Sequence, residues 1–243
     1  MDKIVIVGAT SGIGYEVAKG FIELGWNVGV AGRRKEVLDE LVALAPERVK
    51  AGVIDILTDD APEMLESLIE KLGGMDVYFH TSGIGYNNPQ LDVEKELATV
   101  KTNTLGFTRM VSAAFHHFEK AGRGYIAVIS SIAGTKGLGT APAYSATKRY
   151  QRHYIDSLSQ LAHMRRLKIR FTDIRPGFVN TALLKGDKYP LQMDVKKVAT
   201  HIVHSLLVQK RVVVIDWKYD ILVFFWRLVP EFVWERLRSI KIK

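Results

Sequence analysis

A chain of 243 residues with 47% hydrophobic residues can bury one substantial core but is short for two independent domains. It has no cysteine, which excludes disulfide bonds, thiolate nucleophiles and cysteine-based metal sites. The formal net charge of +8 would suit nucleic acid or an anionic membrane, but zinc-finger, RNA-binding and basic-zipper signatures are missing, so we expect no nucleic-acid partner. The first apolar run is too short for a signal peptide, and we expect a cytoplasmic protein, with membrane association left open.

The beginning of the chain has the order strand, glycine turn, helix. Residues 4–7 form a short apolar strand, the turn reads Gly8-x-x-x-Gly12-x-Gly14, and an amphipathic stretch covers 15–24. Glycines permit a tight turn and let a pyrophosphate approach the N–H groups at the helix start, where the helix dipole favours negative charge. This stretch therefore predicts a dinucleotide site. The residues assigned to it are Gly8, Thr10, Ser11, Gly12, Ile13 and Gly14.

The end of the second predicted strand, residues 27–31, indicates which dinucleotide is preferred. An acidic residue there would bind a ribose 2′-hydroxyl and repel a 2′-phosphate. The chain instead continues with Gly32, Arg33, Arg34 and Lys35. A guanidinium is a permanently charged fork of donors that suits a phosphate, so Arg33 and Arg34 favour NADP(H) over NAD(H).

Strands and helices then alternate along the chain. We predict helices at 35–45 and 61–72, strands at 49–56 and 75–82, a mostly helical stretch at 91–121, strands at 124–131 and 167–173, a helix at 194–208 and a strand at 211–215. Such alternation implies right-handed crossovers and a mostly parallel sheet covered on both faces. The adjacent His116 and His117 point to different sides of a helix, so we expect no metal site.

Three polar side chains predict proton transfer. The strand at 124–131 delivers Ser131, and a helix that begins at Pro142 places Tyr144 and Lys148 on one face, one turn apart. A nearby ammonium group favours the phenolate and lowers the pKa of a phenol. A hydroxyl such as that of Ser131 can hold a carbonyl or alcohol oxygen while Tyr144 gives or takes its proton.

With these motifs, the chain from Lys3 to about Ile215 resembles the short-chain dehydrogenase/reductase family. The glycine turn matches the family's phosphate turn, and Asp55 with Ile56 matches its adenine contact. Asn103, Ser131, Tyr144 and Lys148 match its active-site residues, and Pro176-Gly177 with Thr181 matches its nicotinamide-side loop. The resemblance implies an α/β fold with a doubly wound, Rossmann-type sheet of seven parallel strands and helices on both faces.

The resemblance also implies individual roles. Tyr144 would be the general acid in reduction and the base in oxidation, and Ser131 would orient the substrate oxygen. Lys148 would bind the nicotinamide ribose and depress the pKa of Tyr144, while Asn103 would hold a water that links Lys148 to solvent. The further cofactor contacts expected are Asp55, Ile56, Ser82, Gly83, Pro176, Gly177, Val179 and Thr181. One departure is His80-Thr-Ser-Gly83, where the family usually has Asn-Asn-Ala-Gly; we expect a variant turn there and an intact site.

The segment 217–243 differs from the rest of the chain, because it holds three of the four tryptophans and the apolar run 221–226. We divide the chain into a dinucleotide-binding and catalytic part, 1–216, and this aromatic-rich segment of the same domain. Its apolar run cannot span a bilayer, which needs ~20 residues. Three destinations remain open for it: the substrate mouth, a neighbouring subunit and an anionic membrane surface.

The sequence therefore predicts an oxidoreductase that transfers hydride between NADP(H), with NADPH preferred over NADH, and a carbonyl or secondary alcohol. The apolar segment 217–243 favours a lipophilic substrate, such as a steroid or a long-chain keto-lipid. We expect a homo-oligomer, either a dimer or a tetramer. The alternative is a non-catalytic nucleotide-sensing protein on the same fold, against which the intact set Ser131, Tyr144, Lys148 and Asn103 speaks.

Overall fold

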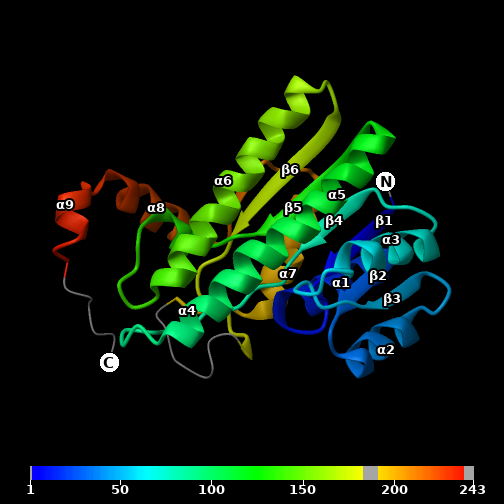
Figure 1. The fold of residues 1–243 in the computed structure, drawn as a ribbon. Coiled ribbons are helices and arrows are strands. Elements are labelled where there is room, and N and C mark those ends of the chain that lie inside the picture. Colours follow the sequence, from blue (N-terminus) through cyan, green and yellow to red (C-terminus); the bar gives the residue numbers. More distant parts are fainter. Residues whose placement is uncertain (1, 183–190, 238–243) are drawn as a thin grey trace.

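The computed structural model describes residues 2–182 and 191–237, so the last part of the aromatic-rich segment, 238–243, lies outside the described residues. The strands are β1 (Lys3–Val7), β2 (Asn27–Gly32), β3 (Val49–Val53), β4 (Val77–His80), β5 (Arg123–Ile129), β6 (Lys168–Arg175) and β7 (Val212–Val214). They pair in parallel in one sheet of order β3-β2-β1-β4-β5-β6-β7 (Figure 1). This sheet, with helices on both faces, confirms the predicted Rossmann-type class.

The helices are α1 (Gly12–Glu23), α2 (Lys35–Leu44), α3 (Ala61–Leu72), α4 (Val93–Val100), α5 (Phe107–Ala121), α6 (Pro142–Met164), α7 (Val195–Leu207), α8 (Trp217–Leu228) and α9 (Glu231–Trp234). A π-helical turn η1 (Lys101–Gly106) joins α4 to α5, and a short 3₁₀ helix η2 (Ile132–Thr135) precedes α6. The core clusters place α1, α2 and α7 on one face of the sheet and α3, α5 and α6 on the other.

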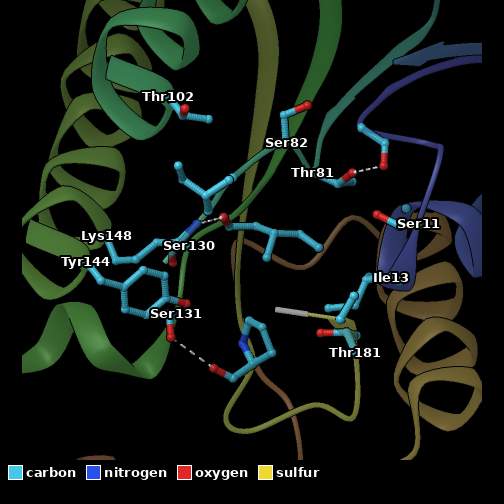
Figure 2. A pocket seen from close by; sticks show the side chains of 18 of the residues that line it. Ser11, Ile13, Thr81, Ser82, Thr102, Ser130, Ser131, Tyr144, Lys148 and Thr181 are labelled. Atoms are coloured by element: carbon cyan, nitrogen blue, oxygen red, sulfur yellow. Dashed lines mark hydrogen bonds between the residues drawn. The ribbon is translucent and has the colours of Figure 1, made fainter. Parts of the chain in front are cut away.

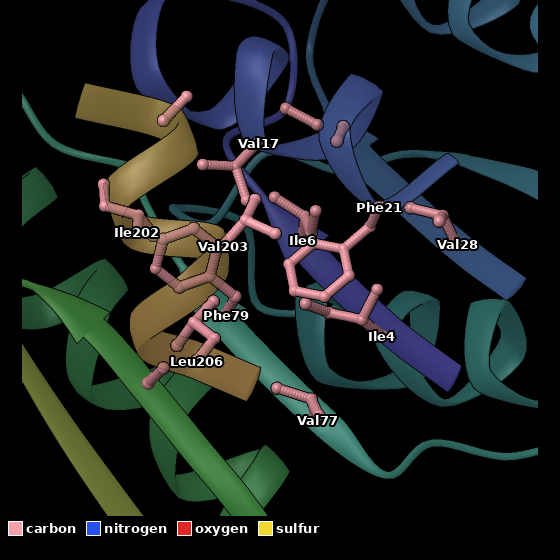
Figure 3. Packing of buried hydrophobic residues seen from close by; sticks show 14 of the residues in the cluster. Ile4, Ile6, Val17, Phe21, Val28, Val77, Phe79, Ile202, Val203 and Leu206 are labelled. Carbon is pink, nitrogen blue, oxygen red and sulfur yellow. The ribbon is translucent and has the colours of Figure 1, made fainter. Parts of the chain in front are cut away.

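Alternation along β1 shows why both faces are covered. Ile4 and Ile6 belong to the core under α1 and α7, whereas Val5 and Val7 belong to the core under α3 and α5, and all four are fully buried. Successive strand side chains point to opposite faces, so an uninterrupted apolar strand requires apolar layers on both sides. Figure 3 shows the first of these layers, in which Phe79 packs with residues of α7.

The predicted strand at 49–56 is too long at its carboxyl end. β3 ends at Val53, and Asp55 begins a turn in which its side chain accepts a hydrogen bond from the Leu57 N–H at 3.0 Å. The Asp55 carbonyl also accepts from the Thr58 N–H at 3.2 Å. An aspartate that bonds to the backbone two residues on favours a turn over a strand. Asp55 and Ile56 therefore lie in the loop after the strand and reach the end of the sheet from there.

Helix α8 packs on the carboxyl end of the sheet through one face. Tyr219 and Val223 are buried and form a third apolar cluster with Ile132 of η2. The Tyr219 hydroxyl donates to the Leu191 carbonyl at 3.0 Å, and its ring lies directly on Gly177, where an added Cβ would come within 2.3 Å of the ring. The aromatic-rich segment thus starts as an integral part of the core. No helix in the described part of the chain is long and apolar enough to cross a bilayer.

We expect Gly177→Ala to dislodge α8, because the new methyl group would overlap the buried ring of Tyr219. Overpacking of this kind costs about 1–3 kcal/mol, so the free energy of unfolding in urea should fall by that amount. Gly139→Ala is the matched control, since no heavy atom lies within 4 Å of its added Cβ. Equal stability of the two variants would contradict the described contact.

Candidate active site

A cavity of about 780 Å³ opens at the carboxyl ends of the central strands, around the point where the strand order reverses between β1 and β4. In parallel α/β sheets this is where ligands bind. Figure 2 shows Ser131, Tyr144 and Lys148 on one side of the cavity and Ser11, Ile13 and Thr181 on the other. The predicted residues that line it are Gly8, Thr10, Ser11, Gly12, Ile13, Gly14, Arg33, Asp55, Ile56, Ser82, Gly83, Ser131, Tyr144, Lys148, Pro176, Gly177, Val179 and Thr181. Arg34 and Asn103 are not part of the lining.

The glycine turn leaves its backbone open to a ligand. Gly8 has φ +98°, and a Cβ on Gly14 would lie 2.3 Å from the Gly8 carbonyl oxygen, so neither position accepts a side chain. Helix α1 starts here without an acidic residue in its first turn, and within the described chain the Ser11 side chain makes no capping hydrogen bond. The backbone N–H groups and the helix dipole at the N-terminus of α1 fit a pyrophosphate.

The far end of the cavity carries a positive charge. Arg33 is exposed at the rim, with its guanidinium 4.0 Å from the Asp55 carboxylate. Gly32 carries no side chain that could bind a ribose 2′-hydroxyl, and an added Cβ would come within 2.7 Å of the Thr10 side chain. Arg34 turns away from the lining and donates to the Thr10 carbonyl, which fastens the glycine turn to β2.

Ser131 and Tyr144 meet inside the cavity. Ser131 follows β5 in extended backbone, accepts the Ala133 N–H at 3.1 Å and donates to the Pro176 carbonyl at 3.4 Å. Burial raises the pKa of Tyr144, and a hydrogen bond with the Ser131 hydroxyl counteracts part of that rise. The Lys148 ammonium lies 5.8 Å from the centroid of the Tyr144 ring. Burial is the larger influence, so the net pKa of Tyr144 is raised, and the depression expected from Lys148 stays a prediction.

Lys148 is a buried ammonium with two fixed acceptors. Its Nζ donates to the Ile129 carbonyl at 3.0 Å and to Gln151 Oε1 at 2.9 Å. An ammonium has three protons, and the third has no hydrogen-bond acceptor among the described residues, so it can serve the cavity that Lys148 lines. Burial lowers the pKa of Lys148 to about 8, although the negative charge of Asp173 acts in the opposite direction.

Gln151 is a site residue that the sequence analysis missed. It is fully buried, and its Nε2 donates to the Asn103 carbonyl at 2.9 Å while its Oε1 accepts from Lys148. An ammonium only donates and a carbonyl only accepts, so the amide can be oriented in only one way. The Gln151 side chain therefore joins Lys148 directly to the Asn103 carbonyl. The water that Asn103 is expected to hold, between Lys148 and solvent, stays a prediction. The signal for Gln151 was its spacing, three residues after Lys148 on the same helix face.

The side chain of Asn103 forms hydrogen bonds to residues at the wall of the cavity. Its Oδ1 accepts the Ile84 N–H at 2.9 Å, and its Nδ2 donates to the Ile84 carbonyl at 2.7 Å and to Thr147 Oγ1 at 3.1 Å. Asn103 lies in the π-helical turn η1 and is fully buried. Asn103 thus clamps the loop after β4 to α6, which carries Tyr144 and Lys148.

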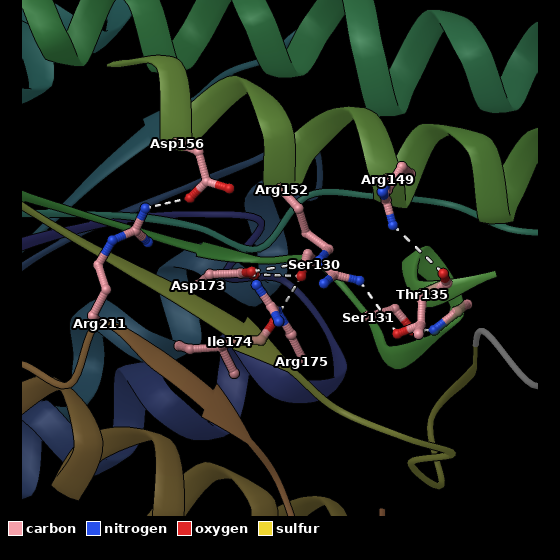
Figure 4. Close-up of polar contacts among 11 residues, drawn as sticks. Ser130, Ser131, Thr135, Arg149, Arg152, Asp156, Asp173, Ile174, Arg175 and Arg211 are labelled. Atoms are coloured by element: carbon pink, nitrogen blue, oxygen red, sulfur yellow. Dashed lines mark hydrogen bonds and ion pairs between the residues drawn. The ribbon is translucent and has the colours of Figure 1, made fainter. Parts of the chain in front are cut away.

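A buried ion network lies behind Ser131 and was also missed. Asp173 is 1% exposed, accepts a hydrogen bond from Ser130, and pairs with Arg175 at 2.5 Å and with Arg152 at 3.8 Å (Figure 4). A carboxylate with two guanidinium partners can stay ionised when buried. The network fixes the strand ends on which Ser131 and the Pro176 loop are mounted.

His80 gives the turn after β4 its unusual character. Its Nδ1 lies 2.9 Å from the Tyr78 hydroxyl, and its Nε2 is buried with no hydrogen-bond partner among the described residues. Burial, and then the charge of Lys148, lowers its pKa to about 3, so this imidazole is neutral. The Thr81 hydroxyl lies 3.0 Å from the Gly8 carbonyl and fastens the glycine turn. The sequence change therefore leaves a connected turn, as expected.

The rest of the lining is mainly apolar and comes from separate segments. It includes Ile84, Tyr86, Leu97, Ala98, Leu138, Phe178 and Trp226, with Glu94 and Lys101 as charged members. Trp226 belongs to α8, so the aromatic-rich segment contributes directly to the wall of the cavity.

Comparison with known proteins places this geometry in context. A model of the short chain dehydrogenase family matches residues 2–190. An uncharacterized oxidoreductase of Myxococcus xanthus is 32% identical over 196 residues, which cover 77% of this chain and 76% of that protein. The NADP-dependent 3-hydroxy acid dehydrogenase of Salmonella typhi is 31% identical over 193 residues, which cover 76% of this chain and 77% of that protein.

Among solved structures, a short chain dehydrogenase/reductase from Burkholderia phymatum in complex with NAD has a TM-score of 0.81. The match covers 92% of each chain at 16% identity, so it bears on the fold alone.

We expect Gln151→Leu to destabilise the protein, because it leaves the buried Lys148 ammonium without one acceptor and the Asn103 carbonyl without its donor. Unsatisfied buried polar groups cost about 1–3 kcal/mol each, so the free energy of unfolding should fall by at least about 1 kcal/mol. Gln160→Leu, at an exposed position of the same helix, is the matched control. If both variants unfold at the same urea concentration, the assigned contacts are wrong.

Proposed function

The chain belongs to the short-chain dehydrogenase family of oxidoreductases, and from this premise we propose that it transfers hydride between NADP(H) and a carbonyl or secondary alcohol of a lipophilic substrate. The observation that carries the proposal is one shared cavity. Ser131, Tyr144 and Lys148 line it together with the glycine turn, so a dinucleotide held on α1 and a substrate oxygen at Tyr144 would meet there.

The residues of the chain would transfer the proton and orient the substrate oxygen. When bound, the nicotinamide supplies or accepts the hydride. In reduction, the Ser131 hydroxyl exchanges its long bond to the Pro176 carbonyl for one to the substrate oxygen, and Tyr144 donates its phenolic proton to that oxygen. The raised pKa of Tyr144 keeps the phenol protonated at neutral pH, which is the state that a general acid needs.

Lys148 would serve as the proton reserve behind Tyr144. Its pKa of about 8 means that the ammonium is mostly protonated at neutral pH but gives up a proton more easily than an ordinary lysine. The phenolate left after each turnover can therefore be reprotonated from this side. Gln151 holds the ammonium in place and connects it to the Asn103 carbonyl at the buried end of the site.

The preference for NADPH is supported by the rim of the cavity. Arg33 offers a permanent charge to a 2′-phosphate, and Gly32 supplies no carboxylate that would bind a 2′-hydroxyl and repel the phosphate. The relative from Salmonella typhi is named as NADP-dependent, which agrees with this preference.

A lipophilic substrate is supported by the lining beyond Tyr144. Leu97, Leu138, Phe178 and Trp226 offer apolar surface from four separate segments of the chain. Such a wall favours an apolar body next to the reacting carbonyl over a small polar acid or a sugar. A steroid or a long-chain keto-lipid fits this description.

We expect Tyr144→Phe to lower kcat for carbonyl reduction by about two decades or more, because it removes the proton donor. NADPH binding, measured by fluorescence titration, should change little. Tyr150→Phe is the matched control on the same helix, since its hydroxyl bonds to Thr108, away from the cavity. Activity of the Tyr144 variant within a few-fold of the parent would refute the assigned role. A parent chain that binds NADPH but reduces no member of a carbonyl panel would favour the nucleotide-sensing alternative.

We expect Arg33→Ser to weaken NADPH binding about tenfold or more and NADH binding much less, because a charge-assisted bond to a phosphate contributes about 1.5–3 kcal/mol. Arg34→Ser is the comparison variant. Its guanidinium holds the Thr10 carbonyl, so its loss should weaken both dinucleotides to a similar degree. Dissociation constants for both dinucleotides separate these effects. An equal change for NADPH and NADH in the Arg33 variant would remove the basis for the NADPH preference.

A further inference from the structure

Helix α8 has two apolar faces, and only one of them is covered. Tyr219 and Val223 face the core, with 1% and 2% exposure. The opposite face carries Trp217, Ile221, Phe224 and Leu228, with exposures of 69%, 49%, 59% and 63%. The spacing of i, i+4, i+7 and i+11 places these four side chains in one stripe along the helix. Scattered apolar residues are ordinary on a surface, but a continuous stripe marks an interaction site.

Further exposed apolar side chains lie beside the stripe or follow it in the sequence. Phe225 lies beside it, with its ring 5.5 Å from that of Phe224 between centroids, and Phe232 and Leu237 in and after α9 are also exposed. We call Trp217, Ile221, Phe224, Phe225, Leu228, Phe232 and Leu237 the apolar ridge. In Figure 1, α8 and α9 lie at the edge of the molecule beyond α6, away from β3 and α2.

The ridge is held in a fixed position on the protein. Trp234 Nε1 donates to the Gly137 carbonyl at 2.7 Å, and Lys136 pairs with Glu231 at 2.7 Å. The rings of Trp226 and Trp234 lie 5.4 Å apart between centroids in an edge-on arrangement. These contacts bind α9 to the loop before α6, so binding at the ridge would cost little ordering entropy.

A second cavity, of about 880 Å³, is lined in part by α8 and α9 and is rich in cations. Its lining includes Lys136, Arg149, Arg152, Arg227 and Glu231, and Arg227 comes from α8 itself. Lys136 is neutralised by Glu231, and Asp173 is shared between Arg152 and Arg175. Burial, and then the charges of Arg175, Arg149 and Arg227, lowers the pKa of Arg152 to about 10 despite its carboxylate partner. Positive charge at this cavity is therefore only partly compensated.

We infer that α8 and α9 bind the surface of an anionic phospholipid bilayer. The apolar ridge enters the boundary between headgroups and acyl chains, and the arginine-rich cavity receives lipid phosphate groups. A rigid aromatic ridge beside basic side chains is the arrangement that binds such a surface. A second copy of the chain fits less well, because a symmetric contact through the ridge would bring the two positively charged cavities together.

Membrane binding would place the active site next to a lipid source. Trp226 lines the catalytic cavity, while its neighbours Phe225 and Arg227 belong to the exposed ridge and to the second cavity. Leu138 lines both cavities. The inference does not depend on the proposed reaction, since vesicle binding is measured without turnover.

The test is sedimentation of the full chain with vesicles of phosphatidylcholine alone and of phosphatidylcholine mixed with phosphatidylglycerol. We expect strong binding to the anionic vesicles only. Phe224→Ser with Leu228→Ser should lower the vesicle partition coefficient about tenfold or more, because each serine removes an apolar side chain from the interface. Arg149→Gln with Arg227→Gln should reduce the preference for anionic vesicles. Leu44→Ser, at an exposed leucine on α2, is the matched control and should bind as the parent does.

Unfolding temperature and NADPH binding of each variant exclude a folding defect. A parent chain that binds anionic vesicles no better than neutral ones would overturn the inference. It would also be overturned if the serine variants keep vesicle binding, or if they change only the oligomeric state measured by light scattering. That last result would assign the ridge to a contact between copies. Deleting α8 would not be informative, because Tyr219 and Val223 belong to the core.

Discussion

The buried ammonium of Lys148 is the constraint on which the active site depends. A charge removed from water must be satisfied by fixed acceptors, and here they are the Ile129 carbonyl and Gln151 Oε1. The first acceptor fixes Lys148 to the end of β5. The second acceptor belongs to the Gln151 amide, which also donates to the Asn103 carbonyl. The Asn103 side chain in turn bonds to the N–H and the carbonyl of Ile84. The hydrogen bonds of this one cation thus connect the end of β5, the turn η1, the loop that contains Ile84 and helix α6. They position the wall of the cavity as well as the lysine.

The same constraint explains why the two titratable groups of the site behave differently. Lys148 and Tyr144 are one helical turn apart, and burial disfavours the charged form of each. The pKa of the lysine therefore falls from 10.5 to about 8 while that of the tyrosine rises above 10.0, so the two values move apart. A buried network centred on Asp173 limits the fall, because its carboxylate favours the ammonium. The Lys148 ammonium is therefore the stronger acid of the two, so the transfer of a proton from it to a Tyr144 phenolate is favourable.

Features set by local spacing could be predicted from the sequence, and features set by distant contacts could not. The glycine turn, the strand alternation and the positions of Ser131, Tyr144 and Lys148 follow from short patterns, and the structure places them in one cavity. Gln151 was overlooked because a polar residue on a helix is ordinarily solvated. Its amide is buried between the Lys148 ammonium and the Asn103 carbonyl, and the second of these lies 48 residues away along the chain. The ionic partners of Asp173 and the role of Arg34 depend on side chains brought together by the fold. The burial that raises the pKa of Tyr144 could not be predicted, because spacing shows the neighbouring charge but not the desolvation.

The distribution of tryptophan in the fold has a spectroscopic consequence. Trp217, Trp226 and Trp234 all belong to α8 and α9, and the fourth, Trp26, packs 4.8 Å from Phe21 between ring centroids, near the opposite end of the chain. Trp226 faces the catalytic cavity, Trp234 is hydrogen-bonded to the Gly137 carbonyl, and Trp217 is the most exposed of the three. Intrinsic emission from this protein is therefore dominated by one small region in which three indoles differ in hydration. The emission wavelength and the quenching of this fluorescence report on the mouth of the active site and on the surface beside it, without any added label.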